Sequence, residues 1–131
     1  EELSGPPTPC FGFALGLERL ISLIPFKEEN RSVNPDIFLV CLGESAKFSG
    51  FQAAHELRLA GFKVERDHEI TSMKSQMRKA NKSNCKFTLI LGENEIESGK
   101  YILKNMNNSE QHKIDSQNLV SEIENWITSK N

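Results

Sequence analysis

The sequence lacks the features that mark membrane proteins and disulfide-rich secreted domains. No apolar run approaches the length of a bilayer-spanning helix. The three cysteines, Cys10, Cys41 and Cys85, lie far apart without a CxxC pair, which favours buried thiols in a reducing, cytoplasmic setting over a disulfide frame or a zinc site. The acidic, turn-rich start is no signal peptide, and the missing initiator Met is typical of a fragment.

The sequence also lacks the common signatures of catalysis and cofactor binding. Neither GxGxxG nor GxxxxGK[ST] follows any expected strand, so a nucleotide-cofactor site is weakly indicated. No nucleophile–base pair and no cluster of metal ligands stands out. The histidines His55, His68 and His112 are scattered, and each is better explained as a surface residue than as a ligand. We therefore predict no metal site and no complete catalytic set in this chain.

A global basic charge is absent, because the net charge is −2. The charges are unevenly distributed, however. Between Ile70 and Gly92 there is no acidic residue, whereas five basic residues fall there: Lys74, Arg78, Lys79, Lys82 and Lys86. A local basic patch on a near-neutral protein is compatible with a small RNA footprint.

What is present is the composition of a globular protein, with 37% hydrophobic and 26% charged residues in a chain of 131. The apolar run 10–15 predicts a strand, and the spacing from Gly16 predicts a helix that Pro25 ends. The polar stretch 27–35 reads as a linker. After it we expect, in order, a strand at 36–42, a helix at 46–60, a strand at 62–66, a helix at 72–84 and a strand at 86–91.

This alternation predicts a parallel sheet with right-handed crossovers. The runs 101–106 and 111–114, with Asn107-Asn108 between them, predict a closing hairpin, and a last amphipathic helix starts near Ser116. The expected fold is α/β: a mixed five-stranded sheet, three parallel strands plus a hairpin, flanked by helices in three layers. Ligands of such sheets bind beyond the carboxyl ends of the strands, here at 43–45, 66–71 and 92–95.

The helix at 72–84 carries Lys74, Arg78 and Lys82 four residues apart, hence on one face. This face is either a solvated surface or a contact for RNA phosphates, which position the backbone without reading its sequence. Reading unpaired bases needs donors and acceptors aimed at their edges. Glu95 can accept from guanine N–H groups, and Gln76 can donate or accept.

Two stretches carry a resemblance to a known family. GFALGLERL, at 12–20, resembles motif 3 of class II aminoacyl-tRNA synthetases in the histidyl form. SMKSQMRKANK with FTLILGENEIESGKYILKNM, between Ser72 and Met106, resembles the anticodon-binding domain of the same synthetases. They occur in the family's order about fifty residues apart. The resemblance implies a class IIa anticodon-binding fold at 36–131, a linker at 27–35 and a remnant of the catalytic domain at 1–26.

The resemblance also implies functional residues. Arg19 and Gly16 match the motif 3 residues that contact ATP. Anticodon contacts fall by position on His68, Gln76, Glu95 and Lys104, and the histidine anticodon has guanine at both ends. The family uses ATP with magnesium to join histidine to tRNA(His). The parent enzyme is expected to be a cytoplasmic homodimer that does not bind a membrane. This fragment, which could be a monomer, would bind the anticodon stem-loop without a cofactor and would catalyse no reaction.

Two alternatives remain open from the sequence. A non-catalytic, synthetase-like regulatory protein could retain the same domain, although the intact motif 3 favours a working enzyme. A small doubly wound signalling or interaction domain is the other option. Receiver domains of that kind need an acidic cluster after the first strand, where this chain has Gly43-Glu44-Ser45.

Overall fold

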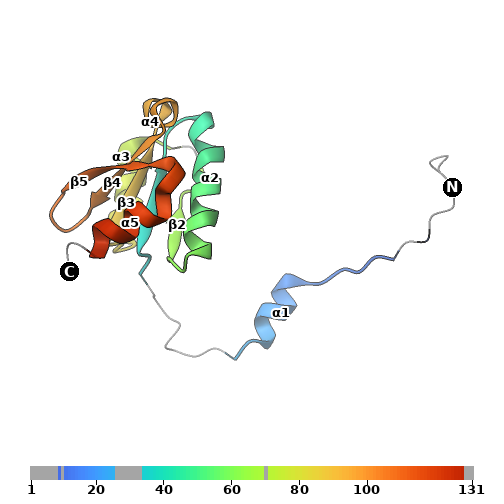
Figure 1. The fold of residues 1–131 in the computed structure, drawn as a ribbon. Coiled ribbons are helices and arrows are strands. Elements are labelled where there is room, and N and C mark those ends of the chain that lie inside the picture. The colour runs from blue at the N-terminus through green and yellow to red at the C-terminus, as the bar shows by residue number, and fades with distance from the viewer. Residues whose placement is uncertain (1–8, 10, 26–33, 70, 129–131) are drawn as a thin grey trace. The chain divides into compact units, whose positions relative to one another are not determined.

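The computed structural model describes residues 9, 11–25, 34–69 and 71–128 (Figure 1). The chain divides into two compact units, Glu1–Val33 and Asn34–Asn131. Most of the predicted linker, residues 27–33, lies outside the described part, and so does Cys10. Each unit is described by itself below.

In the first unit, helix α1 (Leu17–Leu23) forms where the sequence predicts one, with Gly16 as its N-cap. The described residues of α1 bury none of their side chains within the unit. The strand predicted at 10–15 is wrong for the described part of that run, because residues 11–15 have no regular structure. A strand needs a neighbour to pair with, and every described strand pair belongs to the second unit.

The second unit is built on a five-stranded sheet, which confirms the predicted mixed topology. The strand order is β2-β1-β3-β4-β5, with parallel pairing among the first three and antiparallel pairing from β3 to β5. In chain order its elements are β1 (Ile37–Cys41), α2 (Glu44–Leu59), β2 (Val64–Arg66), α3 (Met73–Lys82), β3 (Phe87–Leu91), α4 (Glu93–Ser98), β4 (Lys100–Asn105), β5 (Gln111–Asp115), the 3-10 turn η2 (Ser116–Asn118) and α5 (Leu119–Thr128).

The centre of the sheet explains why its strands are so apolar. The strands β1 and β3 lie side by side, with Leu39 in register with Leu89, and helices cover both faces. A strand buried on both faces reads as a continuous hydrophobic run, and β1 is IFLVC while β3 is FTLIL.

Helices on both faces give the predicted three layers (Figure 1). One face packs against α2 and α5, the other against α3. The first core contains Ile37, Leu39, Ala46, Ala53, Ala54, Leu57, Leu89, Leu91, Leu103, Ile114, Leu119, Ile123 and Trp126. The second core contains Phe38, Val40, Ala80, Cys85 and Ile90. The small residues of α2 bring it close to the sheet: a Cβ on Gly50 would overlap the sulfur of Cys41.

Two details differ from the sequence prediction. The sequence predicts an acid-rich turn where α4 lies, yet GENEIES forms a helix of six residues that ends at Gly99, whose φ of +64° suits glycine. The spacing of Met73, Met77 and Ala80 predicts that all three face inward, but Met73 is 39% exposed, because it belongs to the first turn of α3, at the edge of the sheet. Serine is a favoured N-cap residue, and the hydroxyl of Ser72 does accept from the Ser75 N–H at the start of α3.

Candidate nucleic-acid interface

The carboxyl ends of β1 and β3 form a shallow groove, as the sheet topology predicts. Its volume is about 390 Å³, and its lining consists of Leu42, Gly43, Gly92, Glu93, Asn94 and Glu95. Two strand-ending glycines and the first turn of α4 thus surround it. We call the edge of the sheet that carries this groove the rim; it comprises the described residues 42–45, 66–69, 71–72 and 92–95.

Glu95 lies in the first turn of α4 and is half-buried in this groove. A Cβ built on Gly92 would lie 2.6 Å from Oε2 of Glu95. The absence of a side chain at Gly92 therefore lets the carboxylate rest against the end of β3. This places a hydrogen-bond acceptor in the groove, as a contact with a guanine edge requires.

Gln76 corrects one of the predicted base contacts. The residue is 1% exposed, and its amide bonds to the main chain: Oε1 accepts from the Cys41 N–H at 2.9 Å, and Nε2 donates to the carbonyls of Cys41 at 2.7 Å and Thr71 at 2.8 Å. Both amide donors are thereby used. In this structure Gln76 lies beneath the rim and does not reach a ligand on it.

The geometry of β1 explains why a glutamine is buried there. In a parallel sheet, each residue directs its N–H and its C=O to the same neighbouring strand, and successive residues alternate between the strands on the two sides. Ile37 donates to the Lys63 carbonyl on the β2 side, and Leu42 donates to the Leu91 carbonyl on the β3 side, so Cys41 faces β2. The pairing of β1 with β2 ends at Leu39, two residues before Cys41, where the pairing with β3 ends. The Gln76 amide therefore makes the hydrogen bonds to Cys41 that a further residue of β2 would otherwise make.

The loop that follows β2 is held by Asp67, whose side chain is 6% exposed. It accepts from Lys79 at 2.7 Å, from the Thr71 hydroxyl at 3.0 Å and from the Glu69 N–H at 3.3 Å. Desolvation raises the pKa of Asp67, but the hydrogen bonds from Lys79, Glu69 and Thr71 outweigh it, and the pKa lies below its ordinary value. The ionised carboxylate thus fixes the loop in which His68 is exposed.

The basic residues of α3 divide into two groups. Lys79 is engaged with Asp67. Lys74, Arg78 and Lys82 are exposed on the side opposite the buried Gln76 and Ala80. Among the described residues, none of these three is within salt-bridge distance of an acid. We call these three the α3 stripe; it is a row of exposed cations that begins near the rim at Lys74 and follows α3 away from it.

Lys104 lies apart from the other predicted contacts. It is opposite Thr88 in the pairing of β4 with β3, hence on the face of the sheet that α3 covers. Because β4 runs antiparallel to β3, Lys104 is three residues below the end of β3, or about 10 Å from the rim. The structure thus brings His68, Glu95 and Lys74 to one edge of the sheet, whereas Arg78 and Lys82 follow along α3 away from this edge and Lys104 lies further along the sheet.

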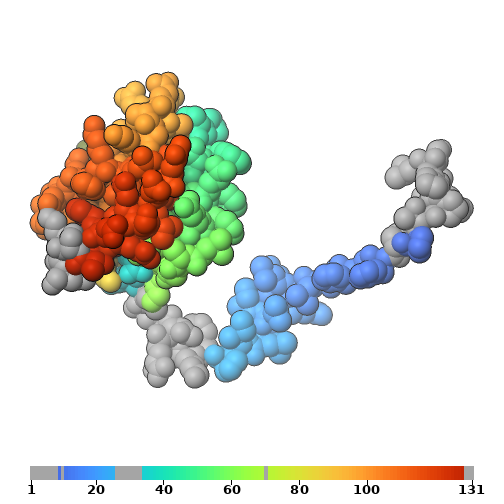
Figure 2. Space-filling model, viewed as in Figure 1, coloured from blue at the N-terminus to red at the C-terminus, as the bar shows by residue number. Residues whose placement is uncertain are grey.

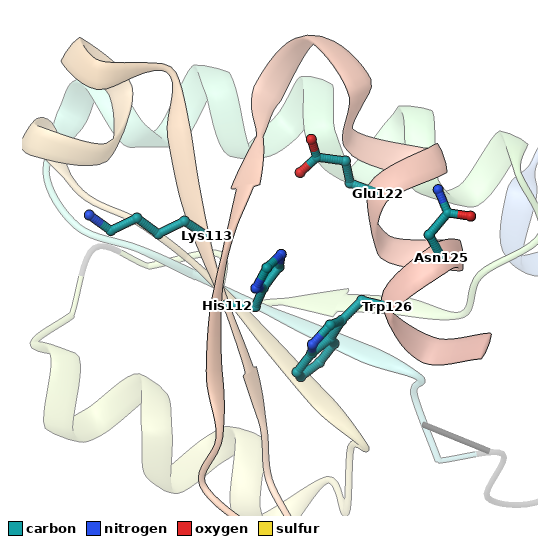
Figure 3. A pocket seen from close by; sticks show the side chains of 5 residues that line it. All are labelled: His112, Lys113, Glu122, Asn125 and Trp126. Carbon is teal, nitrogen blue, oxygen red and sulfur yellow. The ribbon is translucent and has the colours of Figure 1, made fainter. Parts of the chain in front are cut away.

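A second concavity lies between β5 and α5 and contains none of the predicted contacts. Its volume is about 450 Å³, and it is lined by His112, Lys113, Glu122, Asn125 and Trp126. The rings of His112 and Trp126 stack with centroids 6.0 Å apart. Figure 3 shows the Lys113 side chain pointing away from the other four. Sequence reasoning did not single out this surface, because only the pairing of β5 brings His112 to Trp126.

The two residues predicted to contact ATP are exposed, and the described ranges contain no cluster of metal ligands. Gly16 and Arg19 are both exposed on the first unit, and two exposed residues do not enclose ATP. No group of three or more His, Cys, Asp or Glu side chains in the described ranges could hold a metal ion. Within the same ranges, no helix is long and apolar enough to cross a bilayer.

Solved structures that are similar to this chain include tRNA synthetases. The apo histidyl-tRNA synthetase of S. aureus matches 68% of this chain and 26% of its own, with a TM-score of 0.64 and 32% identity. An RNA-binding domain of threonyl-tRNA synthetase from Cryptosporidium parvum matches 70% of this chain and 23% of its own, with a TM-score of 0.64. At 18% identity, this second likeness shows the fold alone.

Sequence relatives indicate which kind of tRNA synthetase this chain is most similar to. The chain is 42% identical to the histidine–tRNA ligase of Caldanaerobacter subterraneus subsp. tengcongensis, over 97% of this chain and 30% of that enzyme. The enzyme of Alkaliphilus oremlandii is 41% identical, over 91% of this chain and 29% of its own length. Residues 36–126 match the family model of the anticodon binding domain. The chain belongs to this anticodon-binding family, and it spans about 30% of the length of these two relatives.

Proposed function

We propose that this protein is the part of a histidine–tRNA ligase that recognises the anticodon of tRNA(His). The observation that carries the proposal is the rim, where the Glu95 carboxylate lines a groove and the exposed His68 loop and α3 stripe lie nearby. In this proposal residues 36–131 form the anticodon-binding domain, 27–35 the linker and 1–26 a remnant of the catalytic domain.

Each group of residues has a chemical task in this proposal. Glu95 accepts hydrogen bonds from the N–H groups of an unstacked guanine, which present two adjacent donors at its Watson–Crick edge. His68 contacts a neighbouring nucleotide. The α3 stripe and Lys104 bind phosphates, which supplies affinity and orientation without sequence information. Gln76 and Asp67 keep the rim in shape from beneath.

The parent enzyme activates histidine with ATP and magnesium and transfers it to tRNA(His), as a cytoplasmic homodimer. Arg19 and Gly16 belong to its ATP site, which needs further residues beyond those described in this chain. The 131-residue chain by itself would bind the stem-loop and catalyse nothing. An assay for histidyl-adenylate formation tests this last point, since any turnover by the isolated chain contradicts it.

The recognition itself is tested by titrating the chain into labelled anticodon stem-loops and following fluorescence anisotropy. The cognate loop is compared with one in which both anticodon guanines are changed to adenine. A lost base contact costs about 1–3 kcal/mol, so we expect the cognate loop to bind at least about fivefold more tightly. Equal affinity for the two loops would contradict the proposal.

A matched pair of variants locates the specificity. Glu95→Gln replaces an acceptor-only group with an amide, and it should reduce the preference for the cognate loop to less than about twofold. Glu97→Gln removes the same charge from the same helix, but Glu97 is exposed and does not line the groove. It should keep the preference. If both variants behave alike, Glu95 is not the base contact.

A further inference from the structure

On the face of the sheet that carries α3, the strands β4 and β5 have no covering helix in the described part of the chain. Helix α3 packs over β1 and over Ile90 of β3. Helices α2, α4 and α5 contribute to the core on the other face, and Figure 2 shows α2, in green, and α5, in red, at the surface on that side. The α3 side of β4 and β5 is therefore an open sheet surface.

Three lysines project from this open surface. Tyr101 of β4 and Ile114 of β5 are buried in the core on the opposite face. Because successive side chains of a strand alternate between the two faces, Lys100, Lys104 and Lys113 point to the α3 side. Figure 3 shows the Lys113 side chain on the side of β5 away from α5. We call these three residues the β4–β5 lysines; the first and the last are exposed, and Lys104 is half-buried.

The register of the strands brings these lysines close together. Lys113 is opposite Ile102, which lies between Lys100 and Lys104 on β4, so Lys113 is a diagonal neighbour of both lysines, at about 7–8 Å. Among the described residues, none of the three is within salt-bridge distance of an acid. Asp115 is opposite Lys100, but its Oδ1 accepts from the main chain of η2. Like charges at this spacing repel one another, and a bound anion relieves that repulsion.

The β4–β5 lysines extend from the rim along the sheet. Ile102 pairs with Ile90, so Lys100 is level with Gly92 at the rim, while Lys104 lies about 13 Å further along β4. The α3 stripe follows α3 on the same side of the sheet. Two sets of cations therefore lead away from the groove on one face of the domain.

This surface suits a nucleic-acid backbone better than it suits bases. The two rings of β4 and β5, Tyr101 and His112, lie on the other face, so these strands offer no aromatic ring here on which a base could stack. Lysine binds phosphate oxygens without regard to sequence. In the proposed function the anticodon bases occupy the rim, so the RNA that continues from the rim along the sheet is the stem, whose two strands carry a dense negative charge.

We propose that the β4–β5 lysines bind the phosphate backbone of the anticodon stem next to the loop, with Lys100 and Lys113 as contacts in addition to Lys104. This inference rests on the proposed function, since it takes the bound RNA to be an anticodon stem-loop. The lysines add affinity and orient the stem, and the reading of the anticodon stays with the rim.

The test measures the salt dependence of stem-loop binding, by fluorescence anisotropy, for the 131-residue chain and for Lys100→Gln/Lys113→Gln. Each contact with a duplex phosphate contributes about 0.9 to the slope of log K against log salt, so the double variant should lower the slope by about 1.8. Lys100→Arg/Lys113→Arg keeps both charges and should keep the slope. Lys47→Gln/Lys63→Gln removes the same charge from exposed positions outside this surface and should leave the slope almost unchanged.

A second RNA locates the contact on the stem. In this RNA the stem phosphates next to the loop are replaced by uncharged methylphosphonates, while the loop is unaltered. The original chain and Lys100→Gln/Lys113→Gln should bind it with equal slopes, because the partners of both lysines are gone. If the variant instead lowers the slope equally for both RNAs, the lysines contact the loop, and the proposal is overturned.

An unchanged slope of Lys100→Gln/Lys113→Gln on the natural stem-loop would also overturn the proposal. If that variant then self-associates in sedimentation, Lys113 serves to protect the edge strand β5 from pairing with a second copy. Anticodon recognition is a separate outcome, because the preference for the cognate loop over its adenine-substituted form is set at the rim and should persist in this variant. A chain without that preference would contradict the proposed function, whatever the salt slopes are.

Discussion

At the level of single residues, the rim depends on side chains that are almost fully buried. Gln76 supplies the partners that the short β2 strand does not provide for Cys41, and it also ties down the Thr71 carbonyl. Asp67 holds the same loop from the other side through Lys79 and Thr71. The exposed His68 is therefore presented by a loop fixed at two points, which lowers the cost of ordering it on binding.

The role of Gln76 leads to a stability prediction. Gln76→Ala leaves the N–H and C=O of Cys41 and the Thr71 carbonyl without their partner, and each unsatisfied buried group costs about 1–3 kcal/mol. Because water will replace some of these bonds, we expect a loss of about 2–4 kcal/mol in the free energy of unfolding, measured by urea denaturation. Asn81→Ala, at an exposed position of α3, is the control and should change it by less than about 0.5 kcal/mol. A similar small change for Gln76→Ala would contradict the role.

The sequence predicts the exposed charges of the site better than its buried polar group. Lys74, Arg78 and Lys82 are exposed on one face, as their spacing indicates. Gln76 is also polar, but its sequence position does not show which way it faces, because an amide can contact water or lie in the core. Gln76 faces inward because the pairing with β2 ends two residues before the end of β1. No local pattern in the sequence reveals this difference in length.

At the level of elements, helix α3 packs against the sheet with one face and carries the predicted phosphate contacts on the other. Its inner face fills the smaller core through Ala80 and Met77 and completes the sheet through Gln76. Its outer face carries the α3 stripe. The Ser72 cap fixes where the helix begins. The sequence therefore sets how far each residue of the α3 stripe lies from the rim.

The α3 stripe predicts a specific salt dependence. Lys74→Gln/Arg78→Gln removes two phosphate contacts, and each contact contributes about 0.7 to the slope of log K against log salt for single strands. We expect the slope measured with the cognate stem-loop to fall by about 1.4, with equal weakening for the loop that lacks both guanines. The variant Lys47→Gln/Lys63→Gln removes the same charge from positions outside α3 and should leave the slope almost unchanged. Equal slopes for the two double variants would argue against contact through α3.

Long periodic elements are predictable from this sequence, and short ones are not. The strands β1 and β3 and the helices α2, α3 and α5 follow from apolar runs and from helical spacing. Helix α4 has six residues, fewer than two turns, and its acid-rich sequence also suits a turn. The strand expected at 10–15 fails because periodicity does not reveal whether a partner strand is present. The displacement of Lys104 from the rim follows from the direction of β4, which is a property of the sheet.

At the level of the whole molecule, the second unit has two surfaces with different chemistry. The rim and the α3 stripe combine a carboxylate acceptor with exposed cations, which suits RNA bases and phosphates. The outer side of α2 exposes the apolar side chains of Phe48, Phe51 and Leu59 and lies across the sheet from α3. The thickness of the three-layer fold separates these two surfaces.

The central claim is that the RNA contacts the rim and α3, and mapping of amide chemical shifts on the isotope-labelled chain during titration with the cognate stem-loop tests it most directly. We expect the large, saturable shifts at His68, Glu95 and along Lys74 to Lys82, while the indole of Trp126, the single tryptophan, stays unchanged between β5 and α5. Shifts that gather instead around Trp126 or the outer side of α2, with the rim unaffected, would contradict the account.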